Sequence, residues 1–150
     1  AKKIIKEMKS KKCKLVLPRD IVCADSLANK AKTYSFSVDR CPVDKMILDI
    51  GPMTEKNIMT IIDKSKTLIW NGPLGAFETL PFDRGTNNIA KYAANRTLDG
   101  QLISIAGGGD TVSALKTSDS VSKFSYVSTA GGAFLEWLEG KTLPGIESLK

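Results

Sequence analysis

Three glycine-rich turns hold the residues of this chain that are best suited to chemistry. They span residues 70–78, 107–111 and 128–132, and each directly follows a short apolar run. Glycine permits sharp turns and lets a ligand approach the peptide groups closely. A glycine turn that opens a helix also presents free N–H donors and the positive end of the helix dipole, which favour phosphate. Three such turns at successive strand ends predict a nucleotide-phosphate site along one edge of a sheet.

The middle turn, Gly107-Gly108-Gly109-Asp110-Thr111, combines glycines with a carboxylate and a hydroxyl. Its glycines would bring the backbone close to phosphate oxygens, and Thr111 would offer a backbone N–H at a helix start. Asp110 is an oxygen ligand for Mg²⁺, which is typically held by one or two carboxylates together with substrate phosphates. A plain helix N-cap, for which Asp is a preferred residue, explains the same pattern equally well.

The first turn (residues 70–78) and the last turn (residues 128–132) can each be interpreted in two ways. In the first, the Asn71 amide can reach phosphate oxygens, and the Glu78 carboxylate can accept hydrogen bonds from ribose hydroxyls. A tight turn with Trp70 and Phe77 in the core and Glu78 in solvent is the favoured alternative for that segment taken alone. In the last turn, backbone N–H groups at Gly132 are candidates for holding a phosphoryl group in transit. The alternative there is a strand-to-helix turn that needs small residues for close packing.

Composition excludes several classes of function. The chain has no His, which removes Ser-His-Asp and Cys-His catalysis and argues against a zinc site. Cys13, Cys23 and Cys41 are widely spaced, which favours free thiols in a reducing cytoplasm. The net charge of +6 is concentrated before residue 33 without interleaved aromatics, so a nucleic-acid partner is not expected. No apolar run approaches the length of a membrane span.

Short strand-like runs alternate with helical patterns along the chain. The expected strands are residues 15–17, 46–50, 67–70, 102–106 and 124–128, and the expected helices are 55–65 capped by Thr54, 86–95 capped by Thr86, 110–116 and 133–138. Residues 18–45 have no clear pattern. The alternation predicts an α/β fold, a three-layer Rossmann-like parallel sheet with helices on both faces. The turns after residues 50, 70, 106 and 128 would then converge on one edge.

Three segments of the chain resemble a known protein family. The segments WNGPLGAFE, GGGDT and YVSTAGGAFLEWLEGKTLPG look like the C-terminal part of phosphoglycerate kinase in its bacterial form. Three long motifs in the right order make the resemblance specific, and it covers nearly the whole chain. Ala130 stands where many members have the first of three glycines, a mild departure because Gly131 and Gly132 remain.

The resemblance implies roles for particular residues. Gly51 and Pro73 would edge the adenine and ribose pocket, Glu78 would hold the ribose hydroxyls, and Asn71 would contact the phosphates. In the middle turn, Gly108 and Gly109 would bind the nucleotide, Asp110 would take Mg²⁺, and Thr111 would bind a phosphate through its N–H. Gly109 and Gly132 would have a catalytic role, donating N–H bonds to the transferring group. Phosphoryl transfer needs positioning and charge neutralisation more than a nucleophile, which fits a chain without His.

The resemblance also implies what surrounds this chain. The family transfers a phosphoryl group between ATP and 3-phosphoglycerate with Mg²⁺, is cytoplasmic, and is expected to be monomeric. Residues 1–150 resemble the C-terminal part of the nucleotide-binding lobe, so the substrate lobe and the start of this lobe would be missing, and the chain alone is expected to be inactive. The alternative function is a stand-alone nucleotide- or phosphate-binding module without catalysis.

Overall fold

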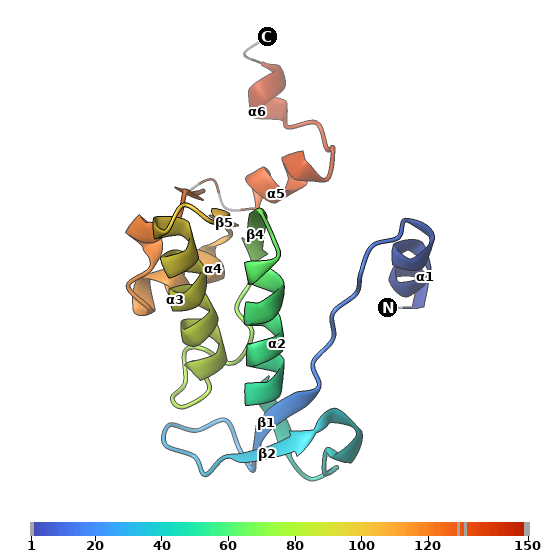
Figure 1. Ribbon diagram of the computed structural model, residues 1–150, viewed down its shortest axis with the longest axis vertical. Helices are drawn as coiled ribbons and strands as arrows, with labels where there is room; N and C mark the ends of the chain where they lie inside the picture. The colour runs from blue at the N-terminus through green and yellow to red at the C-terminus, as the bar shows by residue number, and fades with distance from the viewer. Residues whose placement is uncertain (1, 129, 131, 149–150) are drawn as a thin grey trace.

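The computed structural model describes residues 2–128, 130 and 132–148 of the chain. In chain order its elements are α1 (Lys2–Ser10), β1 (Asp20–Ala24), β2 (Tyr34–Ser37), the short 3-10 helix η1 (Val38–Arg40), β3 (Met46–Ile50), α2 (Pro52–Asp63), β4 (Thr67–Asn71), α3 (Arg84–Leu98), β5 (Ile103–Gly107), α4 (Gly109–Thr117), η2 (Val121–Lys123), β6 (Tyr126–Val127), α5 (Ala133–Leu138) and α6 (Pro144–Glu147). Figure 1 shows β1 and β2 at the opposite end of the molecule from α5 and α6. No helix in the described ranges is long and apolar enough to cross a membrane.

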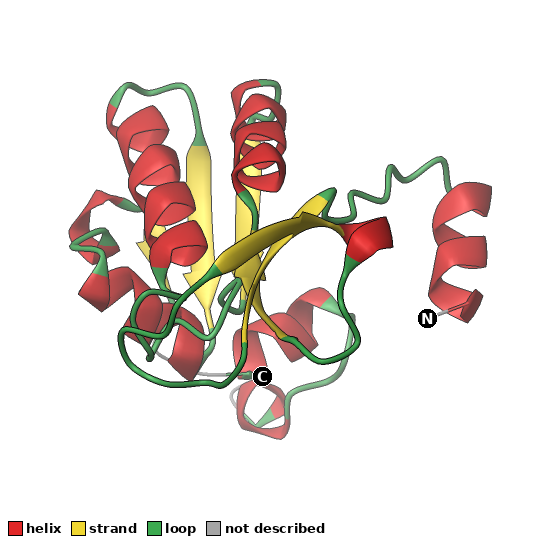
Figure 2. Ribbon diagram, turned by 90° about the horizontal axis from the view of Figure 1, so that it is seen from below, coloured by secondary structure: helices red, strands yellow, loops and turns green. Residues whose placement is uncertain are grey.

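A parallel sheet with strand order β4-β5-β6 forms the centre of the fold. Helices flank it, as Figure 2 shows, which confirms the predicted α/β class. The apolar stripes of α2 and α3 pack with this sheet into one buried cluster, in which Trp70 and Phe124 place their ring centroids 6.1 Å apart. The four expected helices form: α5 has the expected ends, and the ends of α2, α3 and α4 differ from the expected ones by one to three residues.

A second, antiparallel sheet has the order β2-β1-β3. The prediction that residues 46–50 form a strand is confirmed, but their expected place in the parallel sheet is wrong. β3 pairs with β1, a strand that lies in the segment whose pattern was unclear, and that pairing takes up the backbone groups of β3. The turn that follows β3 at Gly51 therefore does not end a strand of the parallel sheet.

The expected first strand, residues 15–17, is also wrong. This stretch is irregular, and Leu17 is 62 % exposed. A strand needs a neighbour to pair its N–H and C=O groups, and no strand in the described ranges pairs with these residues. They connect β1 to α1, which stands away from the rest of the molecule in Figure 1.

Two helices begin differently from the expectation. Helix α2 starts at Pro52, and the Asp20 carboxylate accepts hydrogen bonds from the N–H groups of Met53 and Thr54 at 2.8 and 2.7 Å. Thr54 thus lies in the first turn rather than at the cap. In α3, Thr86 likewise lies inside the first turn, where its hydroxyl accepts a bond from the N–H of Leu74 at 3.0 Å. Both threonines tie a helix start to a distant segment.

Candidate anion-binding edge of the parallel sheet

The first two glycine turns meet where β4 and β5 end. Asn71 and Gly107 are opposite one another in the register of the two strands. One residue further on, the N–H of Gly72 donates a 2.7 Å hydrogen bond to Oγ1 of Thr111, which is 2 % exposed. This bond joins residues 39 positions apart in the chain. The Thr111 side chain therefore holds the first turn against the start of α4, a role that the sequence did not reveal.

The start of α4 presents unused backbone donors. Its N-cap residue, Gly108, has a backbone φ of +95°, which residues other than glycine rarely adopt. No side chain forms a capping hydrogen bond at this helix start. The first N–H groups of any helix lack intrahelical partners, and at the start of α4 these belong to Gly109 and Asp110, which are both exposed. Together with the positive end of the helix dipole, these donors form a favourable place for an anion.

The starts of helices α2 and α3, which pack against the same sheet, are not open in this way. The Asp20 carboxylate occupies the start of α2 through Met53 and Thr54. At the start of α3, Oδ2 of Asp49 accepts a 2.8 Å bond from the N–H of Gly85. Each of these helix starts is thus already satisfied by a carboxylate of the chain itself, which leaves α4 as the one of the three that is open to an external anion.

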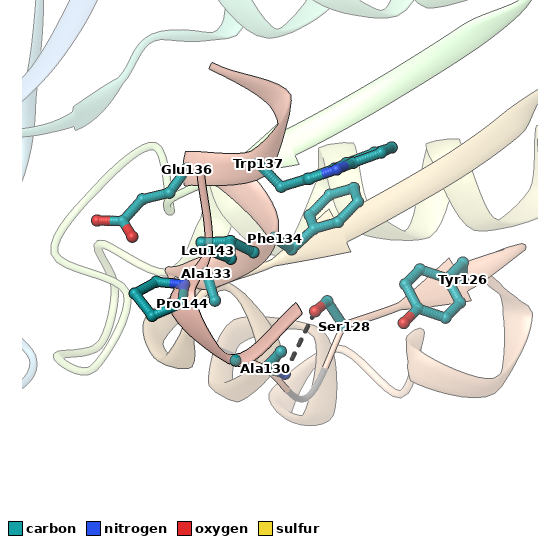
Figure 3. A pocket seen from close by; sticks show the side chains of 10 residues that line it. Tyr126, Ser128, Ala130, Ala133, Phe134, Glu136, Trp137, Leu143 and Pro144 are labelled. Atoms are coloured by element: carbon teal, nitrogen blue, oxygen red, sulfur yellow. Dashed lines mark hydrogen bonds between the residues drawn. The ribbon is translucent and has the colours of Figure 1, made fainter. Parts of the chain in front are cut away.

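The third glycine turn reaches the same edge. A Cβ on Gly107 would lie 3.1 Å from the Phe134 ring and 3.7 Å from Cβ of Ser128, so α5 packs at the end of β5. Ser128 accepts a 3.3 Å bond from the N–H of Ala130, and both line a largely apolar pocket of about 630 Å³ beside α5 and α6 (Figure 3). Gly132 is exposed, and a Cβ there would meet nothing within 4 Å. Thr129 and Gly131 of this turn lie outside the described residues.

The structure places the other three predicted nucleotide-binding residues in different surroundings. Pro73 lines a groove of about 310 Å³ together with residues of β3. Glu78 is exposed, and its carboxylate has no hydrogen bond or ion pair within the described ranges. Gly51 is buried at the start of α2, where its N–H donates a 2.9 Å bond to the carbonyl of Asp20. A Cβ on Gly51 would collide with the Asp20 carboxylate, which gives this glycine a packing role.

One carboxylate is available for a metal at the turn. Asp110 lies in the first turn of α4 with its side chain exposed. Within the described ranges, no group of three or more His, Cys, Asp or Glu residues could hold a metal ion. A single carboxylate suits Mg²⁺, which keeps waters and takes further oxygens from bound phosphates.

Two buried carboxylates that sequence reasoning missed connect the antiparallel sheet to the helices. Burial opposes the charge of Asp20, yet hydrogen bonds from the Thr54 hydroxyl and from backbone N–H groups hold its pKa below the usual value. Asp49 differs, because burial outweighs its hydrogen bonds from Gly85 and Ile50 and raises its pKa to about 6. No pattern in the sequence assigns a role to either residue, so only the tertiary structure identifies their contacts.

A parallel sheet with flanking helices defines an α/β protein, and the uncapped helix start at the carboxyl edge of its sheet is a candidate site for an anion. Comparison with known proteins is more specific. Residues 1–141 match the family model described as phosphoglycerate kinase. The chain belongs to the phosphoglycerate kinase family.

Curated relatives and solved structures agree with this assignment. The phosphoglycerate kinases of Methylorubrum populi and Bradyrhizobium diazoefficiens are 53 % and 52 % identical over 150 residues, which is all of this chain and 38 % of each relative. The solved phosphoglycerate kinase of Coxiella burnetii superposes with a TM-score of 0.89 at 39 % identity, covering 97 % of this chain and 36 % of that one. The kinase of Pyrococcus horikoshii gives a TM-score of 0.71 at 26 % identity. The chain thus spans 38 % of the length of the curated relatives.

Proposed function

We propose that this chain supplies part of the Mg-ATP and Mg-ADP site of a phosphoglycerate kinase, which transfers a phosphoryl group between ATP and 3-phosphoglycerate. The observation that supports this most directly is the start of α4. Its N–H groups are uncapped, while the carboxylates of Asp20 and Asp49 occupy the starts of α2 and α3. Among these three helix starts, only that of α4 is free to bind an external anion such as a nucleotide phosphate.

The proposed roles follow from chemical type and position. The N–H groups of Gly108, Gly109 and Thr111 would bind nucleotide phosphates, with Asn71 beside them. Asp110 would hold Mg²⁺ and thereby neutralise phosphate charge. In this family the reaction transfers the terminal phosphoryl group of ATP to the carboxylate of 3-phosphoglycerate, giving ADP and 1,3-bisphosphoglycerate. The chain's own contribution would be to orient the phosphates and to stabilise charge through fixed donors.

The outer parts of the site belong to the same proposal. Gly51 and Pro73 would edge the adenine and ribose pocket, and the free carboxylate of Glu78 would accept from ribose hydroxyls. Gly109 and Gly132 would donate to the phosphoryl group during transfer. The open space around a Cβ at Gly132 leaves room for such a group. A cytoplasmic, monomeric enzyme remains the expectation for the complete protein.

The decisive experiment uses a chimeric kinase, in which this chain replaces the matching segment of the Methylorubrum populi relative. We expect Asp110→Ala to lower kcat by at least about 100-fold and to weaken Mg-ADP binding, because the only carboxylate of the turn is lost. Steady-state rates at several Mg²⁺ concentrations and calorimetric titration with Mg-ADP measure both effects.

Asp99 provides the matched control. It is an exposed aspartate at the C-terminal end of α3, before β5 begins, so Asp99→Ala removes the same charge away from the turn. Its rates and Mg²⁺ dependence should match those of the parent chimera. An unchanged Mg²⁺ dependence in Asp110→Ala, or equal effects of both substitutions, would refute the proposed metal role.

A further inference from the structure

Two buried threonines from consecutive helices hold the same short turn. Thr111 of α4 accepts the 2.7 Å hydrogen bond from the N–H of Gly72, and Thr86 of α3 accepts the 3.0 Å bond from the N–H of Leu74. Each threonine is the third residue of its helix, and the two are 2 % and 0 % exposed. Between the two bonded positions lies Pro73, which has no N–H of its own. The N–H groups on both sides of this proline are therefore fixed by buried hydroxyls.

A third side chain holds the carbonyl of the same turn. The indole Nε1 of Trp70 donates a 2.6 Å bond to the carbonyl of Gly72, whose φ of +93° is a conformation that favours glycine. Backbone polar groups in a loop need partners, and here β4, α3 and α4 each supply one. The turn is thus a fixed surface before any ligand binds, which lowers the ordering cost of binding.

The hydroxyl of Thr86 is used differently from those of several other helical threonines. Thr60, Thr97 and Thr117 each donate to the carbonyl four residues earlier in their own helix. Thr86 accepts from Leu74, which is 12 positions away and outside the helix. Valine has nearly the same shape but cannot accept this bond. What the hydroxyl adds at this fully buried position is therefore its link to the turn.

We propose that Thr86 is a positioning residue for nucleotide binding, which acts through the N–H of Leu74 on Pro73. The inference rests on the function proposed above, in which Pro73 edges the adenine and ribose pocket. Pro73 and Leu74 both line the groove of about 310 Å³ that they share with residues of β3. Because Thr86 is fully buried, it acts through the turn and not by contact with the nucleotide. Without its hydroxyl, the Leu74 N–H is left unpaired and the turn must move to satisfy it.

This role predicts an effect on KM and not on kcat. The wall of a nucleoside pocket contacts the substrate and the transition state alike, so its displacement weakens both equally. Asp110 and the N–H donors of α4, which would act on the phosphates, belong to a different element. In the chimeric kinase, we expect Thr86→Val to raise the KM for ATP and the Kd for ADP by about 10-fold. The kcat at saturating ATP and the KM for 3-phosphoglycerate should stay within about 2-fold of the parent values.

Two further variants separate positioning from general stability. Thr86→Ser restores the acceptor and should return the KM for ATP to the parent value. Thr97→Val is the matched control, because Thr97 lies near the other end of α3 and its hydroxyl donates to the Ala93 carbonyl and to Oγ of Ser104, both at 2.8 Å. This control should lower the melting temperature and leave the KM for ATP unchanged. Steady-state kinetics, calorimetric titration with ADP and thermal melts provide the three readouts.

The outcomes also distinguish this inference from the proposed function. If Thr86→Val lowers only the melting temperature while Asp110→Ala loses activity, the positioning role is overturned and the proposed function stands. A rise in the KM for ATP that is equal in Thr97→Val overturns the positioning role as well. An unchanged Mg²⁺ dependence in Asp110→Ala refutes the proposed metal role instead. Should Thr86→Val fail to fold, Thr86→Ala removes the same acceptor without placing a methyl group against the N–H, and the same criteria apply to it.

Discussion

Asp49 should make the stability of this fold depend on pH in a direction opposite to that of Asp20, the other buried carboxylate of the antiparallel sheet. Its pKa rises from the usual 3.8 to about 6 because burial disfavours the charged form. The carboxyl is 4 % exposed and accepts bonds from the N–H groups of Gly85 and Ile50, each at 2.8 Å. The charges of Glu55 and Asp83 add smaller repulsions. The folded state therefore holds this proton more tightly than the unfolded chain does.

The sign and the magnitude follow from proton linkage. Well below pH 3.8 the Asp49 carboxyl is protonated in both the folded and the unfolded chain, so it does not lower the free energy of unfolding. As the pH rises through 3.8 toward about 6, the unfolded chain releases the proton first, so the folded state loses relative stability. At about 1.36 kcal/mol per pKa unit, the full penalty approaches about 3 kcal/mol, of which about 2 kcal/mol develops between about pH 4 and about pH 7.

Asp49→Asn tests this directly, because asparagine has nearly the same shape and does not titrate. Urea unfolding followed by circular dichroism, repeated across that pH range, gives the free energy of unfolding of both proteins. We expect the variant to gain about 2 kcal/mol relative to the wild type on going from about pH 4 to about pH 7. Only this change with pH is diagnostic, since the amide also alters one hydrogen bond at every pH.

Asp20→Asn is the matched control, because Asp20 is equally buried but has a lowered pKa. A lowered carboxyl pKa stabilises the fold above the unfolded pKa and loses that contribution as the pH falls, so this variant should lose stability relative to the wild type as the pH rises. If the Asp49→Asn difference is flat with pH, or follows the direction of the Asp20 variant, the burial argument for Asp49 is wrong.

Three further outcomes are expected. Thr111→Val should lower the free energy of unfolding by about 1–3 kcal/mol in urea titrations, because the N–H of Gly72 loses its acceptor, whereas Thr111→Ser should restore most of it. In the chimeric kinase, Gly132→Val should reduce kcat far more than ADP affinity, with an unchanged melting temperature; a parallel loss of ADP affinity and melting temperature would instead indicate packing. The 150-residue chain alone should show no turnover in a coupled kinase assay, since binding both substrates supplies much of the rate, and near-normal turnover would contradict this.

The parallel sheet could be predicted from sequence because its signals are local. Strands β4 and β5 are short apolar runs that end at glycine turns, and the helices α2 and α3 that precede them have clear apolar stripes. The antiparallel sheet could not be predicted in this way. In β1 and β2, polar residues such as Asp20, Ser35 and Ser37 interrupt the apolar pattern, and their pairing joins distant residues. Such strands are stabilised by partners that no local window contains.

The glycine turns illustrate why the candidate site was only partly predictable. Gly51 and Gly108 each precede a helix and looked alike in sequence, yet the structure gives them different surroundings. At Gly51 the missing side chain makes room for the Asp20 carboxylate, which already satisfies the start of α2. At Gly108, within the part of the chain that the structure describes, no side chain caps α4, and Gly109 and Asp110 at its start are exposed. An aspartate from a distant strand thus decides which glycine turn is left for an external anion, and the sequence around the turn does not contain that information.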